Sequence, residues 1–399
     1  MSRVLVSGIG LISPHGDDPL RSFQALMRGE SAVRQVFPDL PKPVAAATAA
    51  FDESRWFTRL QLAGVDRVSQ LAVAAADLAM RDAGSPPTEP ERIGVYVGCG
   101  MGGGAALDTA YRSGGRVPPL TIPAFMPNAP AAHVAMRHGV HGPSLTFSVA
   151  CASSAVALGE AAKAVQRGEV DLAIAGGAEA LIVPGVMLAW QAMQTLASFE
   201  PGEAGSACRP FASDRRGFVL GEGAAFMVLE SADRVRARGG RAYAELAGWG
   251  LSCDATHLTK PDAAGQARAL RQALAVAGLT PADIGYCNAH GTATRIGDAV
   301  ESQALAEVWG AGLGELRVSS TKALHGHLLG AGGALEAAIT VLALQQRQLP
   351  PNAHCSAPDP ECALNLVLAH GEAAPSLQAA VSNSFAFGGT NSVLVFKQA

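Results

Sequence analysis

The string Ser148-Val149-Ala150-Cys151-Ala152-Ser153-Ser154 decides the fold, because a strand pattern ends in it and a helix pattern begins. Residues 145–150 predict a buried strand. Residues 153–166 are rich in Ala, Val, Leu, Glu and Lys and predict a helix that ends at Arg167-Gly168. A strand that leads directly into a helix is typical of an α/β protein.

Cys151 lies between the two elements, so its sulfur is predicted at the amino end of the helix. The dipole and the free N–H groups of a helix start favour a thiolate over a thiol. The position therefore predicts a nucleophile with N–H donors nearby for an oxyanion. The alternative is a buried structural cysteine, which is the commoner state of a free thiol.

Strand-like and helix-like runs alternate along the chain, which predicts α/β layers. The first series covers residues 4–9, 69–83, 93–97, 172–175 and 224–229. After residues 236–240, a second series covers residues 243–251, 267–277, 284–287, 297–309, 316–318, 328–344, 379–384 and 392–396. We therefore divide the chain into two halves, 1–240 and 241–399, which share an order of elements but no strong sequence repeat.

Composition limits the class of protein. With 399 residues, 45 glycines and 49% hydrophobic residues, the chain can bury a large core between closely packed layers. The formal net charge of −4 provides no basic field, so no nucleic-acid partner is predicted. An acidic protein partner would need a local basic patch.

Seven cysteines, an odd number without CxxC spacing, indicate neither a disulfide framework nor a zinc knuckle and fit a reducing cytoplasm. Residues 1–15 predict a strand and a turn rather than a signal peptide. Residues 180–199 carry no charge, but Pro184, Gly185, Gln191 and Gln194 interrupt them. They predict a buried segment rather than a membrane span.

Two strings in the second half place histidines just after strand-like runs. Asn288-Ala289-His290-Gly291-Thr292-Ala293-Thr294 follows residues 284–287, and Ser319-Ser320-Thr321-Lys322-Ala323-Leu324-His325-Gly326-His327-Leu328-Leu329-Gly330 follows residues 316–318. Active groups usually lie at the carboxyl edge of an α/β sheet, so His290 and His327 are expected to face one pocket. Neutral imidazole N–H groups there would hold a developing oxyanion, although a lone histidine is more often structural.

Together with Cys151, these strings resemble the Cys-His-His set of β-ketoacyl-acyl carrier protein synthases, condensing enzymes of the thiolase-like superfamily. The resemblance covers nearly the whole chain, from residues 3–10 to residues 382–391. It implies a five-layered α-β-α-β-α fold built from two similar halves, and a dimer. It also implies a cofactor-free, metal-free condensation of an acyl group on Cys151 with malonyl-acyl carrier protein, the substrates being carried on the phosphopantetheine arm of the carrier.

The resemblance assigns a role to each polar group. Cys151 is the nucleophile, and His290 and His327 hold the malonyl thioester oxygen during decarboxylation. Lys322 and Glu336 form a buried polar network that orients His327 and sets the charge near the sulfur. From the residues alone, a structural ion pair is an equally good interpretation of Lys322 and Glu336.

Other roles are implied by the same resemblance. The N–H groups of Cys151 and Phe387 receive the oxyanion, and residues 385–389 form a gating loop in which Ala386 replaces a frequent glycine. If that glycine needs a positive φ, Ala386 restricts the hinge. Thr292 and Thr294 hydrogen-bond the pantetheine arm, with Ala293 where glycine or serine is frequent.

The pocket and docking residues depart from the common pattern. Leu107 and Trp190 correspond to positions that line the acyl pocket, although a core role for Trp190 is equally plausible. Arg67 matches a position that docks the carrier protein, although exposed basic residues are commonly just solvated. Gln194 stands where arginine is frequent. These departures favour a specialised pathway enzyme.

The expected pathway is therefore either fatty-acid synthesis or polyketide and aryl polyene synthesis. A degradative thiolase is a rival, but it would need a second catalytic cysteine, which residues 385–391 lack. A non-catalytic chain-length-factor-like partner is another, against which the retained Cys151, His290 and His327 argue. The dimer is expected to be a homodimer or a heterodimer with such a factor. For Asp298 and Glu301, which lie near a helix start, capping and packing are as good an interpretation as a functional role, and we leave them outside the site.

Overall fold

The structure is a computed structural model that describes residues 2–368 and 370–399. The first half contributes the strands β1 (Val4–Ile12), β4 (Ile93–Gly98), β5 (Ser144–Phe147), β6 (Leu172–Glu179) and β8 (Gly223–Ser231). The second half contributes β9 (Ala244–Cys253), β10 (Tyr286–Asn288), β11 (Arg317–Ser319), β13 (Asn365–Leu366), β15 (Ala379–Phe385) and β16 (Thr390–Lys397). These strands form one continuous 11-stranded sheet in the order β13-β11-β10-β15-β16-β9-β1-β8-β6-β4-β5.

The two halves repeat one topology. The first runs β5-β4-β6-β8-β1 and the second runs β11-β10-β15-β16-β9, so in both the spatial order is third, second, fourth, fifth and first strand. In both halves the fifth strand pairs antiparallel with the first and the fourth, while the second pairs parallel with the third and the fourth. A short β1–β9 pairing at Leu5 and Val6 joins the halves. The repeat that the amino-acid letters do not display is thus present in the topology.

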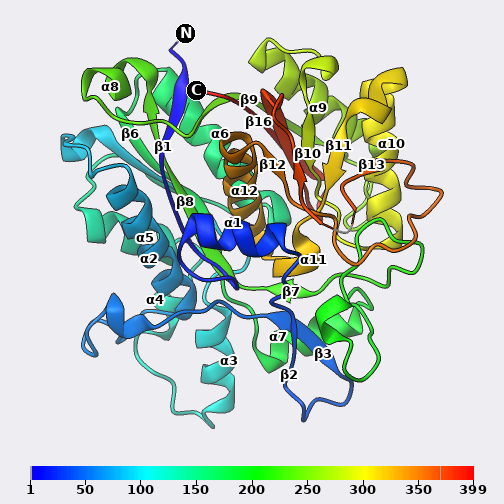
Figure 1. The fold of residues 1–399 in the computed structure, drawn as a ribbon. Coiled ribbons are helices and arrows are strands. Elements are labelled where there is room, and N and C mark those ends of the chain that lie inside the picture. Colours follow the sequence, from blue (N-terminus) through cyan, green and yellow to red (C-terminus); the bar gives the residue numbers. More distant parts are fainter. Residues whose placement is uncertain (1, 369) are drawn as a thin grey trace.

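Helices complete the layers (Figure 1). The helices α6 (Ser153–Gln166) and α12 (Gly332–Gln346) pack together in the middle and contact strands of both halves. The helices α2 (Arg67–Asp82) and α5 (Ala129–His138) cover the outer face of the first half, and α9 (Ala263–Ala277) and α10 (Arg295–Trp309) cover that of the second. The predicted α-β-α-β-α arrangement is therefore confirmed, with an apolar cluster around α6 and α12 at its centre.

A Gly-X-Gly pair on the first strand of each half lets the outer helix approach closely. A Cβ atom at Gly8 or Gly10 of β1 would lie 2.2–2.3 Å from backbone oxygens of α2. A Cβ atom at Gly248 or Gly250 of β9 would lie 1.9–2.3 Å from backbone oxygens of α9. Because no side chain fits in this space, glycine is required at both pairs of positions.

The remaining elements are short or peripheral. The helices are α1 (Pro19–Met27), α3 (Gly104–Arg112), α4 (Thr121–Phe125), α7 (Pro184–Ala192), α8 (Ala232–Ala237) and α11 (Lys322–His325). The strands are β2 (Arg34–Val36), β3 (Val44–Ala47), β7 (Leu220–Gly221), β12 (Gln348–Leu349) and β14 (Glu372–Ala373).

Two burial predictions are wrong. The strand expected over residues 145–150 is β5, which ends at Phe147 and lies at the open edge of the sheet, so that Leu145 is 46% exposed. The segment 180–199 is only partly buried, because α7 packs at the surface with Met187 as its one buried residue.

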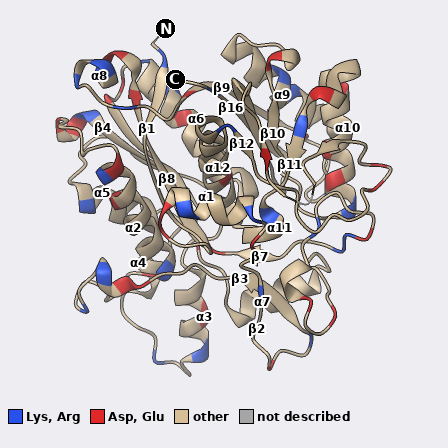
Figure 2. Cartoon of the chain, viewed as in Figure 1, with Lys and Arg blue, Asp and Glu red and all other residues tan. Residues whose placement is uncertain are grey.

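Among the described residues, no helix is both long and apolar enough to cross a membrane. Lysines and arginines are interspersed with acidic residues over both halves (Figure 2).

Candidate active site

Cys151 sits in a sharp turn between β5 and α6, as predicted. A 3-10 turn over Ala150–Ala152 leads into α6, and Ala150 has a φ of 46°, in the left-handed region that non-glycine residues seldom adopt. The N–H of Ala334 near the start of α12 donates to Ser154 Oγ near the start of α6 at 2.8 Å. Two helix amino ends therefore meet beside the sulfur, and both favour negative charge there.

The net ionisation of the thiol differs from the expectation. Burial raises the pKa of Cys151 to about 12, although the charge of Lys322 and the N–H of Phe387 act to lower it. The helix position alone predicted a thiolate, and that prediction is wrong for the resting site, because residues from both halves exclude water from the sulfur. Cys151 rests as a thiol, and charge on its sulfur has to be stabilised as the reaction proceeds.

His327 contacts the sulfur directly. Its Nε2 lies 3.1 Å from Cys151 Sγ, and its Nδ1 accepts the backbone N–H of Leu329 at 3.3 Å. A nitrogen that accepts a hydrogen bond carries no proton, so the neutral ring holds its proton on Nε2, toward Cys151. The backbone N–H of His327 donates to the carbonyl of Val219, the residue before β7, at 2.7 Å. This hydrogen bond fixes the loop that carries His327 against β7.

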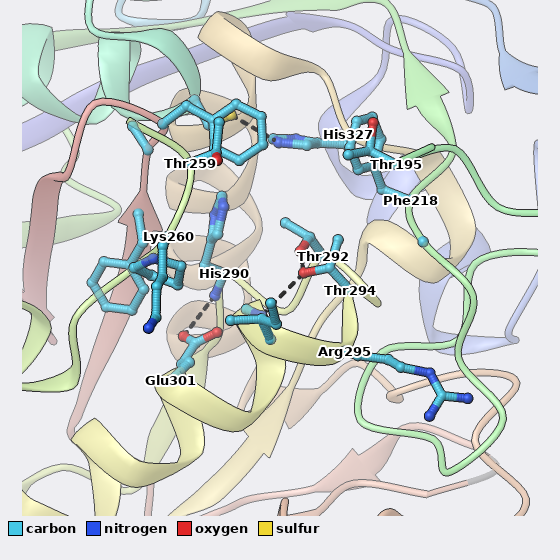
Figure 3. A pocket seen from close by; sticks show the side chains of 18 of the residues that line it. Thr195, Phe218, Thr259, Lys260, His290, Thr292, Thr294, Arg295, Glu301 and His327 are labelled. Carbon is cyan, nitrogen blue, oxygen red and sulfur yellow. Dashed lines mark hydrogen bonds between the residues drawn. The ribbon is translucent and has the colours of Figure 1, made fainter. Parts of the chain in front are cut away.

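His290 faces His327 across the same cavity (Figure 3). The two rings are perpendicular, with centroids 5.4 Å apart. Burial, followed by the charge of Lys322, holds the pKa of both imidazoles well below the usual value. Both rings are therefore neutral at pH 7, and the prediction that they share one pocket with Cys151 is confirmed.

Glu301 holds the loop that carries His290. Its carboxylate accepts the backbone N–H groups of His290 and Gly291 at 2.8 and 2.7 Å and the side-chain amide of Asn383 at 3.0 Å. Its neighbour Asp298 accepts the N–H of Ala293, a residue with a φ of 65°. From the sequence, Asp298 and Glu301 were left outside the site, with capping and a functional role equally good interpretations, so this positioning was missed.

Lys322 and Glu336 form a buried ion pair, as the resemblance implied. Lys322 Nζ lies 2.5 Å from Glu336 Oε1, and each side chain is 1% exposed. Burial raises the pKa of Glu336 to about 7 even though Lys322 acts to lower it. The cation acts electrostatically on Cys151, His290 and His327.

The loop after β15 places a donor at the sulfur. The backbone N–H of Phe387 lies close enough to the Cys151 sulfur to act against the rise of the thiol pKa, so a donor is present where the oxyanion role needs one. Among the described residues, Ala386 is not one of those with positive φ, whereas Gly388 and Gly389 have φ values of 88° and 78°. The condition under which Ala386 would strain the hinge therefore does not arise in this conformation.

The cavity above Cys151 has a volume of about 450 Å³. Trp190, Thr292 and Thr294 line it, and the two threonine hydroxyls are 3.0 Å apart. Trp190 packs against Phe218 at a centroid distance of 5.3 Å and against the apolar cluster that includes Cys151 and Met187, so it lines the cavity and also extends this core. Leu107, on α3, and Arg67 are not among the described residues that line this cavity.

The sulfur and imidazole nitrogens also meet the spacing of a metal site. The ligand atoms of Cys151, His290 and His327 lie within 4.8 Å of one another. A metal on His327 Nε2 would need the ring proton on Nδ1, where the N–H of Leu329 points. The arrangement is therefore better suited to an oxyanion than to a cation.

Comparison with known proteins gives this site a family. Residues 1–234 match the family described as "Beta-ketoacyl synthase, N-terminal domain", and residues 243–356 match "Beta-ketoacyl synthase, C-terminal domain". The chain therefore belongs to the β-ketoacyl synthase family, as its sequence strings predicted. The protein is therefore an acyltransferase of fatty-acid or polyketide synthesis.

Its similarity to individual proteins extends over their full length. The chain is 40% identical to Nodulation protein E of Rhizobium meliloti over 406 residues, covering 99% of each chain. It is 36% identical to 3-oxoacyl-[acyl-carrier-protein] synthase 2 of Staphylococcus aureus (strain COL) over 409 residues, covering 99% of this chain and 98% of the relative. The solved ishigamide ketosynthase/chain length factor matches with a TM-score of 0.91 at 31% identity, covering 100% of this chain and 99% of that one.

Proposed function

We propose that this ketosynthase joins an acyl group, carried as a thioester on Cys151, to a two-carbon unit from malonyl-acyl carrier protein, giving a 3-oxoacyl-acyl carrier protein. The observation that carries the proposal is the geometry at the sulfur. His327 Nε2 lies 3.1 Å from Cys151 Sγ, a second neutral imidazole faces it, and the N–H of Phe387 reaches the same atom. A nucleophile thus shares one cavity with donors for negative oxygen.

Acyl transfer exchanges one thioester for another. The Cys151 sulfur attacks the carbonyl of the incoming acyl thioester, and the oxygen takes the negative charge beside the N–H groups of Phe387 and Cys151. The carbon–sulfur bond to the pantetheine arm then breaks, and that arm leaves as a thiol with the proton that Cys151 gave up. Because the pKa of Cys151 is about 12, the helix ends and the Lys322 charge act on the transient sulfur anion rather than on a resting thiolate.

Condensation uses the two imidazoles. Malonyl thioester loses carbon dioxide, and the electron pair of the broken bond becomes an enolate whose oxygen accepts N–H donors from His290 and His327. The enolate carbon attacks the acyl carbonyl on Cys151, the bond to sulfur breaks, and one proton from solvent restores the thiol. Neutral rings suit this step, since each offers a donor without stabilising the starting carboxylate as a cation would.

The carrier-bound substrates follow from the same family, and we place Thr292 and Thr294 along the pantetheine arm because their hydroxyls line the approach to His290. Leu107 lies on α3, which contacts α7. Its role in the acyl pocket therefore requires that a second subunit cover the surface near α3. We assign the activity to the cytoplasm, where free thiols such as Cys151 stay reduced.

A second subunit, either identical or chain-length-factor-like, is proposed to cover the open edge at β5. Exposed apolar side chains gather on the consecutive packed elements α3, α4, α5 and β5, with Tyr111 83%, Ile122 65%, Met136 67% and Leu145 46% exposed. An apolar face beside an unpaired strand edge is typical of an interface. Both kinds of pairing stay open, since each would bury this face.

Mass spectrometry of the intact protein tests the activity. The protein is incubated with a panel of acyl-carrier proteins, and the acyl mass is located on Cys151, with Cys151→Ala as the blank. Malonyl-carrier protein is then added and the 3-oxoacyl product is measured. His327→Ala is expected to slow product formation far more than acyl transfer. The proposal fails if no donor in the panel forms an adduct on Cys151, and the role of His327 fails if both steps slow equally.

A further inference from the structure

The mouth of the Cys151 cavity carries three cations that form no ion pair with a carboxylate among the described residues. Arg216, Lys260 and Arg295 line the cavity and are exposed. In the described part of the chain, none of the three has a carboxylate oxygen within 4.0 Å, and none has a side-chain hydrogen bond. Most other arginines are paired, including Arg215, which lies 2.5 Å from Asp359.

The residues that line the cavity contribute little negative charge to offset these three cations. Glu301 is the one carboxylate among the described lining residues, and it is buried and accepts the backbone N–H groups of His290 and Gly291. The mouth is therefore a positive patch on a chain whose formal net charge is −4. A positive cleft in an acidic protein raises the local concentration of anionic ligands and steers their approach.

The three cations come from separate elements that meet around the histidines. Arg216 precedes β7, Lys260 lies between β9 and α9, and Arg295 is the first residue of α10. Lys260 and Arg295 lie on either side of His290 (Figure 3). The segment of Lys260 is joined to the Phe387 loop, because the N–H of Gly388 donates to Leu258 O at 2.7 Å.

Arg67, the docking residue that the resemblance implies, already forms an ion pair with Glu222 inside the protein. Its guanidinium donates to both carboxylate oxygens of Glu222, at 2.7–3.2 Å, and to Ala49 O at 3.3 Å. Glu222 is 5% exposed at its side chain, so this pair holds the fold together at the start of α2. An arginine held this way has few donors left for a partner.

Resting on the proposed function, we infer that Arg216, Lys260 and Arg295 form the docking site of the acidic carrier protein, and that Arg67 does not. The three residues line the cavity through which the pantetheine arm must reach Cys151. The anions it would meet there are the phosphodiester at the root of the arm and the carboxylates of the carrier around it. Arginine and lysine pair with both groups through charge-assisted hydrogen bonds.

Kinetics with two acyl donors test the docking site. The triple variant Arg216→Gln/Lys260→Gln/Arg295→Gln is compared with a control that also loses three exposed cations without a carboxylate partner, Arg34→Gln/Arg81→Gln/Arg347→Gln. The donors are an acyl-carrier protein and the neutral acyl-N-acetylcysteamine thioester, which has neither phosphate nor protein. The mouth variant is expected to raise the KM for the acyl-carrier about 10- to 100-fold more than the KM for the neutral thioester. Its KM should also depend less steeply on salt.

The outcomes separate the two proposals. If the wild-type protein accepts the acyl-carrier and the mouth variant shows the same KM, the docking site is wrong. An equal rise in the matched control would mean that net charge, not this patch, steers the carrier. If Arg67→Gln raises the KM as much as the mouth variant does, the exclusion of Arg67 is wrong. If neither donor acylates the wild-type protein, the proposed function fails and the docking site fails with it.

Discussion

The buried pair of Lys322 and Glu336 yields a prediction that separates folding from chemistry. The pair is 2.5 Å apart with both side chains 1% exposed, so removing either partner leaves an uncompensated charge in the core. We expect Lys322→Met and Glu336→Gln each to cost about 3–5 kcal/mol of unfolding free energy. The double variant Lys322→Met/Glu336→Leu removes both charges and is expected within about 2 kcal/mol of the parent protein.

Activity should follow a different order. Lys322 acts electrostatically on Cys151 and on both histidines, so the double variant loses that influence although it stays folded. We expect its condensation rate to fall about 100-fold or more. Urea unfolding at pH 8, where the Glu336 carboxyl with its pKa of about 7 is ionised, gives the stabilities. Acylation and product formation on the same samples give the rates.

Two results would refute this reasoning. A double variant that condenses at the parental rate would reduce the pair to a structural ion pair, the other interpretation that the residues allowed. Single variants as stable as the parent would show that Lys322 and Glu336 are not desolvated as their burial indicates.

Two further predictions concern the cavity and the pH dependence of stability. Trp190→Ala removes a ring that packs against Phe218 and Phe387, and the larger cavity should admit longer acyl chains; competition among donors of different length, scored by mass on Cys151, measures the shift. Burial raises the pKa of Glu179 from 4.5 to about 7, so the folded state keeps a proton that the unfolded state loses. Its contribution to stability is complete below about pH 4.5 and is lost as the pH rises to about 7, a change of about 3 kcal/mol. Glu179→Gln should remove that part of the slope, which unfolding at pH 5 and pH 7.5 measures.

Each has a clear contrary result. An unchanged ranking of acyl lengths in Trp190→Ala would place the chain-length limit elsewhere in the cavity. Parallel stability profiles of the parent protein and Glu179→Gln would show that this carboxyl does not titrate between pH 4.5 and 7.

The fold could be predicted from local patterns because strand and helix periods are local. Cys151, His290 and His327 could be placed together for the same reason, since each follows a strand and strand ends of one sheet converge. The Gly-X-Gly pairs at Gly8 and Gly248 were a further signal of duplication, visible only once both strands were known to lie under a helix.

What escaped prediction depends on contacts between distant segments. The exposure of β5 could not be predicted, because a central strand and an edge strand differ in their neighbours rather than in their own residues. The raised pKa of Cys151 comes from residues of both halves that exclude water. Glu301 looks like any acid at a helix start, and its role appears only when the loop of His290 folds onto it.

The repeated topology brings Cys151 of the first half and His327 of the second half into contact. Cys151 follows the third strand of the first half, β5, and His327 follows the third strand of the second, β11. The 3.1 Å contact between sulfur and imidazole therefore joins corresponding points of two copies of one architecture. A rotation of one half against the other would change this distance with no local rearrangement at either residue. The length of the catalytic contact therefore depends on how the two halves are aligned.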